Sequence, residues 1–250
     1  MNIVVCLKRV PDTEAKIKVT ADGKGLDLAG VQWIMAPYDE IAVEKALQLR
    51  DVGGGGTVTV VTVGPAEASK ELRTALAMGA DQAVHVVAKD GAGDAAATAR
   101  ALADAIRGSA FDMILCGKQA TDEDDAAVGP MLAALLDLPC VAFVTALEAA
   151  AGKATAKREV DGELEVLEVD LPAVFTAQKG LAEPRLPGLK GIMASKKKPL
   201  VEKPLTAAAS ATELRSVALP PGRAGCKRLP ATREGIQQLL QALRSERGVL

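Results

Sequence analysis

Short apolar runs alternate along the first part of the chain with segments in which the apolar residues have helical spacing. Runs such as IVVCL and TVTVVTV are rich in β-branched residues, which is typical of strands buried on both faces of a sheet. The apolar runs are residues 3–7, 57–63, 82–87, 111–117, 140–147 and 173–178. The segments with helical spacing are residues 38–50, 66–79, 93–108 and 131–138. This alternation predicts βαβ units, and therefore an α/β fold with a doubly wound parallel sheet.

Two stretches depart from this alternation and predict antiparallel structure. Residues 17–35 carry Asp22-Gly23 between short apolar runs, which predicts a hairpin-like excursion. Residues 153–162 and 163–172 alternate apolar and polar positions around an Asp-Gly turn. This is the pattern of an antiparallel hairpin, which we expect on the edge of the fold.

The chain changes character after the last of the predicted strands. Residues 180–204 mix Pro, Gly, Lys and isolated apolar residues without a helical or strand period. Residues 232–246 predict one amphipathic helix, with Thr232 as its N-cap. A long segment with so little periodicity cannot bury its own apolar residues. We therefore expect an α/β domain over residues 1–190 and an extended C-terminal arm over residues 191–250, which lies on its own domain or on a partner chain.

Composition excludes several classes of function. The 30 Lys and Arg against 32 Asp and Glu give a net charge of -2, and aromatic residues make up 2%, so neither a basic field nor a stacking platform for nucleic acid is expected. Four scattered Cys and one His predict no metal site and no disulfide framework. No stretch approaches the ~20 apolar residues of a membrane span, and the apolar run at the start is too short for a signal peptide. We expect a soluble protein of the bacterial cytoplasm or a matrix-like compartment.

Ligands of an open parallel sheet bind beyond the carboxyl ends of its strands. The candidate loops are therefore residues 8–12, 63–65 and 117–130, together with the corner at 36–39. The loop CGKQATDEDDAAVGP is the strongest candidate, because backbone amides that enter the following helix suit a phosphate. Its consecutive acids oppose phosphate unless they turn away or meet cations. A solvated acidic loop without a ligand is the alternative.

Other features of the sequence favour structural roles. The Gly53–Gly56 run lies before a strand and lacks the spacing of a phosphate loop. His85 lies in the middle of a predicted strand, and Cys6 and Cys116 end buried strands, where most cysteines are inert. The lysines at 196–198 are most simply a solvated patch. No arrangement predicts a catalytic residue, so we expect a protein without bond-making chemistry of its own.

Five segments together resemble the beta subunit of electron-transfer flavoprotein. They are VVCLKRVPD, MAPYDEIAVEKALQL, RTALAMGAD, CGKQATDEDDAAVGPMLA and LAEPRLPGLKGIMASKKKP, and the match runs in order from about residue 1 to 204. The resemblance implies an adenine-nucleotide-hydrolase-like fold that buries one AMP as a structural nucleotide. It implies a heterodimer with an alpha subunit, which holds most of the FAD. It also implies an electron carrier between acyl-CoA dehydrogenases or similar flavin dehydrogenases and a membrane quinone oxidoreductase.

The resemblance also implies functional residues, position by position. Those of the AMP pocket would be Cys6, Ala36, Pro37, Tyr38, Asp39, Val63, Asp122, Glu123, Asp124, Asp125, Ala126, Ala127, Val128, Gly129, Pro130, Met131, Leu132 and Ala133. The loop that anchors a dehydrogenase would carry Leu189, Ile192, Met193 and Lys197. Where many members are polar this chain has Ala126–Val128, so phosphate contacts there must come from backbone amides. Where some members have Tyr near the flavin, it has Thr13, so an aromatic contact is lost.

Two alternatives stay open. A bifurcating subgroup of the family binds a second FAD in place of AMP and tends to show RQAIDGDTAQVGP, whereas Lys118 and Glu123 at the corresponding places favour AMP. A stand-alone nucleotide-binding protein resembling universal stress proteins is the other alternative. The long C-terminal arm speaks against it, because a monomer has no evident use for such a segment.

Overall fold

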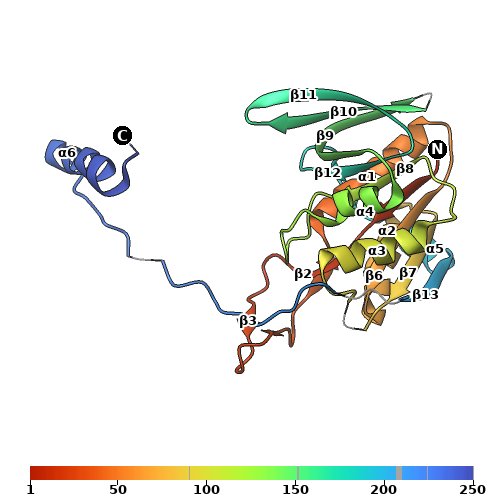
Figure 1. The fold of residues 1–250 in the computed structure, drawn as a ribbon, viewed down its shortest axis with the longest axis horizontal. Helices are drawn as coiled ribbons and strands as arrows, with labels where there is room; N and C mark the ends of the chain where they lie inside the picture. The colour runs from red at the N-terminus through yellow and green to blue at the C-terminus, as the bar shows by residue number, and fades with distance from the viewer. Residues whose placement is uncertain (90, 151, 207–209, 224, 250) are drawn as a thin grey trace.

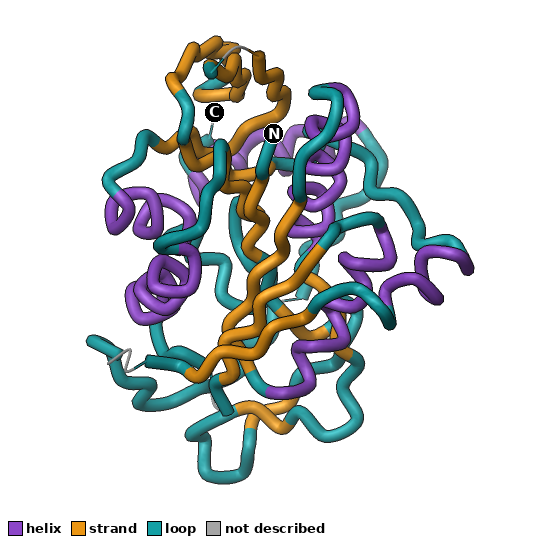
Figure 2. Tube along the Cα trace, turned by 90° about the vertical axis from the view of Figure 1, so that its right-hand side faces the viewer, coloured by secondary structure: helices purple, strands orange, loops and turns teal. Residues whose placement is uncertain are grey.

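A large sheet runs through the centre of the domain, with helices on both of its faces (Figures 1 and 2). The computed structural model describes residues 1–89, 91–150, 152–206, 210–223 and 225–249. In this part of the chain nine strands form the sheet, in the order β11-β10-β9-β12-β8-β1-β6-β7-β13. Their bounds are β1 Ile3–Cys6, β6 Val58–Gly64, β7 Gln82–Val87, β8 Met113–Gly117, β9 Cys140–Ala150, β10 Lys153–Val160, β11 Glu163–Asp170, β12 Ala173–Ala177 and β13 Leu200–Pro204. The pairs from β9 through β12, β8, β1, β6 and β7 to β13 are parallel.

Two layers of helices cover the sheet. The bounds of the helices are α1 Pro37–Val52, η1 Ala66–Ala68, α2 Ser69–Met78, α3 Ala95–Ile106, α4 Val128–Leu136, α5 Leu189–Ser195, α6 Arg233–Ala242 and η2 Leu243–Arg247. Alternate residues of β1 face opposite layers: Ile3 and Val5 pack with α1 and α2, and Val4 and Cys6 pack with α3 and α4. Because β1 is buried on both faces, its sequence is apolar at every position. The predicted α/β fold with a doubly wound sheet is confirmed.

The expected excursions from the parallel sheet also form. Short strands β2 (Arg9–Pro11) and β5 (Trp33–Met35) pair with each other, and β3 (Lys18–Val19) pairs with β4 (Leu26–Asp27). At the far edge, β10 and β11 form the predicted antiparallel hairpin, which continues from β9. Its turn has positive φ at both Asp161 and Gly162, as a two-residue type I′ turn requires.

Residues 180–204 differ from the expectation that they have no regular structure. They contain α5, which packs on α2, and β13, which adds a parallel strand beside β7. Leu189 therefore begins a helix instead of lying in a loop. Both elements are too short to show a period, and tertiary contacts with α2 and β7 determine their conformation. The sheet thus continues beyond residue 190, where we expected the arm to begin.

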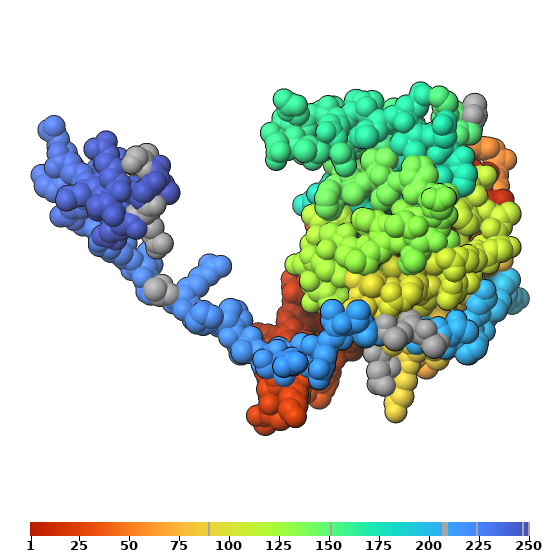
Figure 3. Space-filling view, in the orientation of Figure 1, coloured from red at the N-terminus to blue at the C-terminus, as the bar shows by residue number. Residues whose placement is uncertain are grey.

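The first part of the arm lies on the domain. Leu205 packs near Ala92 and Ala97, and the amides of Ala211 and Thr212 donate to Asp94 at the start of α3. Further along, the amide of Val217 donates to the carbonyl of Gly23, in the turn between β3 and β4, at 2.8 Å. After this contact the chain leaves the domain, and α6 lies apart from it (Figures 1 and 3). Thr232 caps α6 by accepting a hydrogen bond from the amide of Gly235, as the sequence predicted.

Candidate functional site

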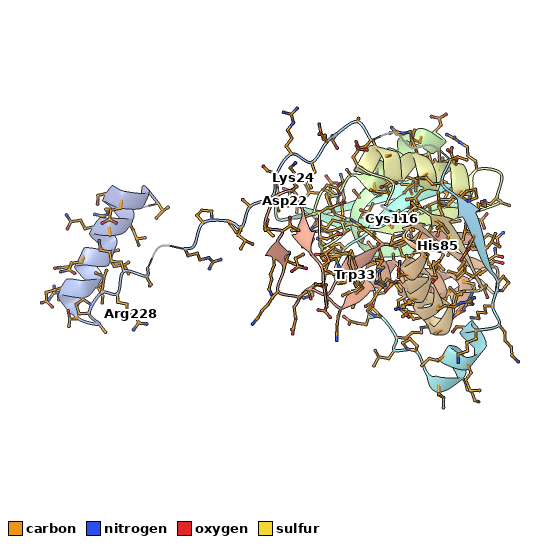
Figure 4. The ribbon with its side chains drawn as sticks, turned by 90° about the horizontal axis from the view of Figure 1, so that it is seen from below. Asp22, Lys24, Trp33, His85, Cys116 and Arg228 are labelled. Carbon is orange, nitrogen blue, oxygen red and sulfur yellow. The ribbon has the colours of Figure 1, made fainter. Side chains whose placement is uncertain are left out.

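A cleft of about 430 Å³ lies beyond the carboxyl ends of β1, β6, β7 and β8. This volume is within the range of small-ligand pockets. The cleft extends from Cys6 and Cys116 at the strand ends to Trp33 on the ribbon β2–β5; Cys116 and Trp33 are labelled in Figure 4. This is the edge of the sheet at which the sequence predicted a ligand site.

The structure brings together many of the residues that the family motifs single out. Those that line the cleft are Cys6, Asp39, Val63, Asp122, Glu123, Asp125, Ala126, Ala127, Val128 and Gly129. Others lie behind its wall: Ala36, Leu132 and Ala133 are buried in the core. Met131 is exposed on α4, and Asp124 accepts a hydrogen bond from Gln119.

Asp39 joins the ends of two strands at the base of the cleft. Its carboxylate accepts the amide of Lys8, after β1, at 2.7 Å and the amide of Gly117, in β8, at 2.8 Å. A side chain at Gly117 would overlap this carboxylate, so glycine is required there. Burial raises the pKa of Asp39 to about 7, although the two amides and the charge of Lys8 oppose the shift. Asp39 therefore fixes the geometry of the cleft from within the structure.

The acidic loop meets a cation. Lys8 Nζ lies 3.0 Å from Asp122 and 3.0 Å from Glu123. Burial alone would lower the pKa of Lys8, but the two carboxylates outweigh it and the pKa is raised. Because Lys8 offsets their charge, these acids oppose an anion less strongly than the sequence alone suggests. Asp124 and Ala126 have positive φ, and the backbone bends sharply there as it enters α4.

The start of α4 presents backbone donors at the wall of the cleft. Val128 and Gly129 are the first residues of this helix, so no carbonyl within the helix is placed to accept a hydrogen bond from their amides. Gly129 does not need positive φ. A Cβ at this position would instead lie 2.6 Å from Cγ2 of Thr176 on β12. In the same loop the buried hydroxyl of Thr121 has no hydrogen-bond partner within the described residues.

Sequence reasoning missed part of the cleft. The residues that it did not single out include Leu28, Trp33, Lys89, Gly91, Ala92, Gly93, Thr98 and Leu102. Arg9 donates to Glu71 and lies 4.8 Å from the ring centroid of Trp33. The loop after β7 had a usable signal, because it too follows a buried strand. The contributions of Leu28 and Trp33 depend on how the ribbon folds back, and no local pattern reveals that.

Cys6, Cys116 and His85 are packed inside the domain, whereas Cys140 and Cys226 are exposed. Cys6 and Cys116 are direct neighbours in the register of β1 and β8. The contact with Cys6 and burial together raise the pKa of the Cys116 thiol, which disfavours the reactive thiolate. His85 is fully buried, and its Nε2 lies 3.1 Å from the carbonyl of Gly64. Within the described residues no group of three or more His, Cys, Asp or Glu is arranged to hold a metal ion.

The second surface of interest is α5 and the turn before it. Leu189 is 75% exposed and Met193 65% exposed, and Leu186 and Ile192 are exposed beside them. Lys197 is exposed two residues after the end of this helix. Arg185, just before this turn, forms an ion pair with Glu44 of α1 at 2.6 Å. The predicted docking residues thus lie on one short, exposed helix and in the turn that follows it.

Comparison with known proteins identifies the family. The model of the electron transfer flavoprotein domain matches residues 25–208. A protein of Syntrophomonas wolfei is 46% identical over 224 residues, which cover 90% of this chain and 88% of the relative. Relatives in Bacillus subtilis, 48% identical over 81% of this chain and 78% of their own, and in Bradyrhizobium diazoefficiens, 39% identical over the full length of both, carry the same description. All three are named electron transfer flavoprotein subunit beta.

Such subunits act as electron carriers together with an alpha subunit, and are not catalysts themselves. None of the described helices has the length and hydropathy that a bilayer span requires. The order of the motifs, the doubly wound sheet and the matches over most of the chain agree: the chain belongs to the electron transfer flavoprotein family, as a beta subunit.

Proposed function

We propose that this subunit binds one AMP in the cleft as a structural nucleotide and docks a flavin dehydrogenase through α5. The alpha subunit would hold most of the FAD. Electrons would pass from acyl-CoA dehydrogenases or similar enzymes through this FAD to a membrane quinone oxidoreductase, in the bacterial cytoplasm or a matrix-like compartment. The observation that carries the nucleotide assignment is the position of the start of α4 at the cleft.

The residues present fit a nucleoside monophosphate. The amides of Val128 and Gly129 would hold the phosphate, and the side chains that replace the polar residues of many family members do not affect such contacts. Lys8 reduces the repulsion from Asp122 and Glu123. The apolar lining at Val63 and Leu102 suits an aromatic base.

Identification of the bound nucleotide tests this assignment. The heterodimer is purified, heated to release its small molecules, and analysed by mass spectrometry. We expect about one AMP per heterodimer besides FAD. A second FAD without AMP would favour the bifurcating alternative, and no second nucleotide would overturn the assignment. Gel filtration with and without the alpha subunit separates a heterodimer from a stand-alone nucleotide-binding protein.

The docking role is supported by the exposure of α5. Burying one Leu contributes about 1.5–3 kcal/mol, which corresponds to roughly ten- to a hundredfold in affinity. Leu189→Ala should therefore raise the KM for the dehydrogenase by about tenfold or more and leave AMP and FAD content intact. Leu164→Ala is the matched control, because Leu164 is an exposed leucine on β11 at the opposite edge of the sheet. Equal KM values for the parent protein and Leu189→Ala would rule out docking through this residue.

A further inference from the structure

Side chains of two elements fasten the end of α5 to α2. Arg73 of α2 donates from Nη1 to the carbonyl of Ser195 at 2.5 Å and to that of Lys198 at 2.9 Å. In return, Lys198 Nζ donates to the carbonyls of Leu76 and Ala80 at 2.9 and 2.6 Å. The ammonium group thus satisfies carbonyls at the end of α2, where a helix accepts a positive charge favourably.

The backbone of α5 also approaches α2 closely. A Cβ at Gly191 would overlap the carbonyl oxygen of Ala77, so only glycine allows this distance. Ser195 is buried, and its hydroxyl donates to the carbonyl of Ile192 at 2.9 Å. These contacts leave Leu189 and Met193 on the outer side of α5, where they are exposed.

The three consecutive lysines after α5 therefore differ in environment. Lys196 and Lys197 are exposed, whereas Lys198 is partly buried against α2. Burial lowers the pKa of Lys198, although the charge of Asp81 partly opposes the shift. The sequence interpretation of all three as one solvated patch is wrong for Lys198.

We propose that Lys198 and Arg73 are positioning residues for the docking of the dehydrogenase, and that Lys198 is not one of the charges that steer the partner. This inference rests on the proposed docking role of α5. Without these contacts α5 would spend part of its time away from α2. The apparent affinity of a partner falls in proportion to the fraction of molecules in the competent conformation. A tenfold fall in that fraction would raise KM about tenfold and leave the rate at saturation unchanged.

The test measures electron transfer from reduced dehydrogenase to the intact heterodimer as a function of dehydrogenase concentration and ionic strength. Lys198→Met should raise KM about five- to tenfold, keep kcat, and keep the salt dependence of kcat/KM. Lys198→Arg keeps the charge and the donors and should recover most of the affinity. Lys197→Met should instead weaken the salt dependence, because an exposed charge acts mainly through long-range attraction. An unchanged KM in Lys198→Met, or a salt dependence that falls as in Lys197→Met, would overturn the proposal.

Hydrogen exchange of residues 189–195, measured without the dehydrogenase, reads the position of α5 directly. Exchange should be faster in both Lys198→Met and Arg73→Met, and unchanged in Lys70→Met, which alters an exposed lysine on α2. Unchanged exchange in the first two variants would show that Lys198 and Arg73 do not hold α5 against α2. Because Arg73 and Lys198 lie on different elements, a folding defect of one variant does not remove the test. If Leu189→Ala keeps its KM although exchange rises in the Lys198 and Arg73 variants, the dehydrogenase does not dock through α5. Lys198 and Arg73 would then hold α5 against α2 without positioning it for a partner.

Discussion

The cleft and α5 are both placed by charged side chains, but the two surfaces are built differently. At the cleft, Asp39 and Gly117 lie among the ends of central strands, and small changes there meet buried backbone. At α5, a short helix is attached from outside by Arg73, Lys198 and Arg185, and its apolar side chains face solvent. Substitutions at the cleft should therefore lower the free energy of unfolding of the whole domain. Substitutions on the outer face of α5 should weaken only the binding of a partner.

The largest expected effect is at Gly129. Gly129 is the second residue of α4, where alanine is ordinarily tolerated, but here a Cβ would lie 2.6 Å from Cγ2 of Thr176. We expect Gly129→Ala to lower the free energy of unfolding by roughly 2–3 kcal/mol, as overpacking does, and to reduce nucleotide content. Thr176→Ser removes the methyl group but keeps the hydroxyl that accepts from the Phe143 amide, so the double variant should recover stability. Denaturant unfolding measures the effect.

Gly188→Ala is the control for this comparison, because Gly188 has open space around its Cα just before α5. Its free energy of unfolding should match that of the parent protein. A loss at Gly188 as large as that at Gly129 would contradict the difference between the two surfaces.

Arg185→Met removes the ion pair that joins the turn before α5 to Glu44 of α1. Glu44 on α1 is 5% exposed and would lose its charged partner, whereas Arg185 is 41% exposed and partly screened by solvent. We expect a loss of roughly 1–2 kcal/mol. Despite burial, hydrogen bonds from Arg185 and Gln48 lower the pKa of Glu44 in the folded protein. Its contribution is therefore present above the unfolded pKa of 4.5 and is lost as pH falls through the lower, folded value. Unfolding measured between pH 3 and 7 should show a smaller loss at the acid end; a loss independent of pH would exclude the ion pair as its cause.

Asp39→Asn tests the carboxylate at the base of the cleft. Because its folded pKa is raised from 3.8 to about 7, the folded protein binds more protons than the unfolded chain between these values. Stability from this group is therefore fully present below pH 3.8 and is lost as pH rises through about 7. We expect the parent protein to lose about 1 kcal/mol between pH 6 and 8 and the Asn variant to show a flatter profile. Parallel pH profiles would mean that Asp39 stays ionised throughout.

The smallest expected effect on stability is that of Leu189→Ala. A side chain that is 75% exposed has little apolar surface to lose from the folded state. Its free energy of unfolding should lie within about 0.5 kcal/mol of the parent value, as for other surface substitutions. A larger loss in the isolated heterodimer would show that Leu189 packs inside the assembly and is not free for a dehydrogenase.

The central sheet could be predicted from the sequence because its strands are buried on both faces and its helices are long enough to show a period. Val5 and Leu115, for example, are fully buried, so a polar side chain at either position would be buried without a hydrogen-bond partner. Elements at the edge, β13 and α5, could not be predicted because their conformation depends on β7 and α2 rather than on their own few residues.

The candidate site follows the same division. Asp39 and Gly129 lie in segments that follow from the rule that ligands bind at strand ends, whereas the assignment of Cys6 to the pocket comes only from the family resemblance. The contact between Lys8 and Asp122 joins residues 114 positions apart, and the environment of Lys198 depends on carbonyls of a distant helix. No local pattern contains such pairings. The sequence alone therefore could not show whether a cation offsets the acids of the loop, and it grouped Lys198 with the two exposed lysines before it.

The detached position of α6 has a kinetic consequence. Ile236, Leu239 and Leu240 are exposed on this helix, which is joined to the domain by the segment after Val217. For any partner that binds both the domain and α6, the second contact is an intramolecular event at an effective concentration on the order of millimolar. Either contact can then open and re-form before the other dissociates. A partner that engaged both surfaces would therefore remain attached while one of the two contacts is broken.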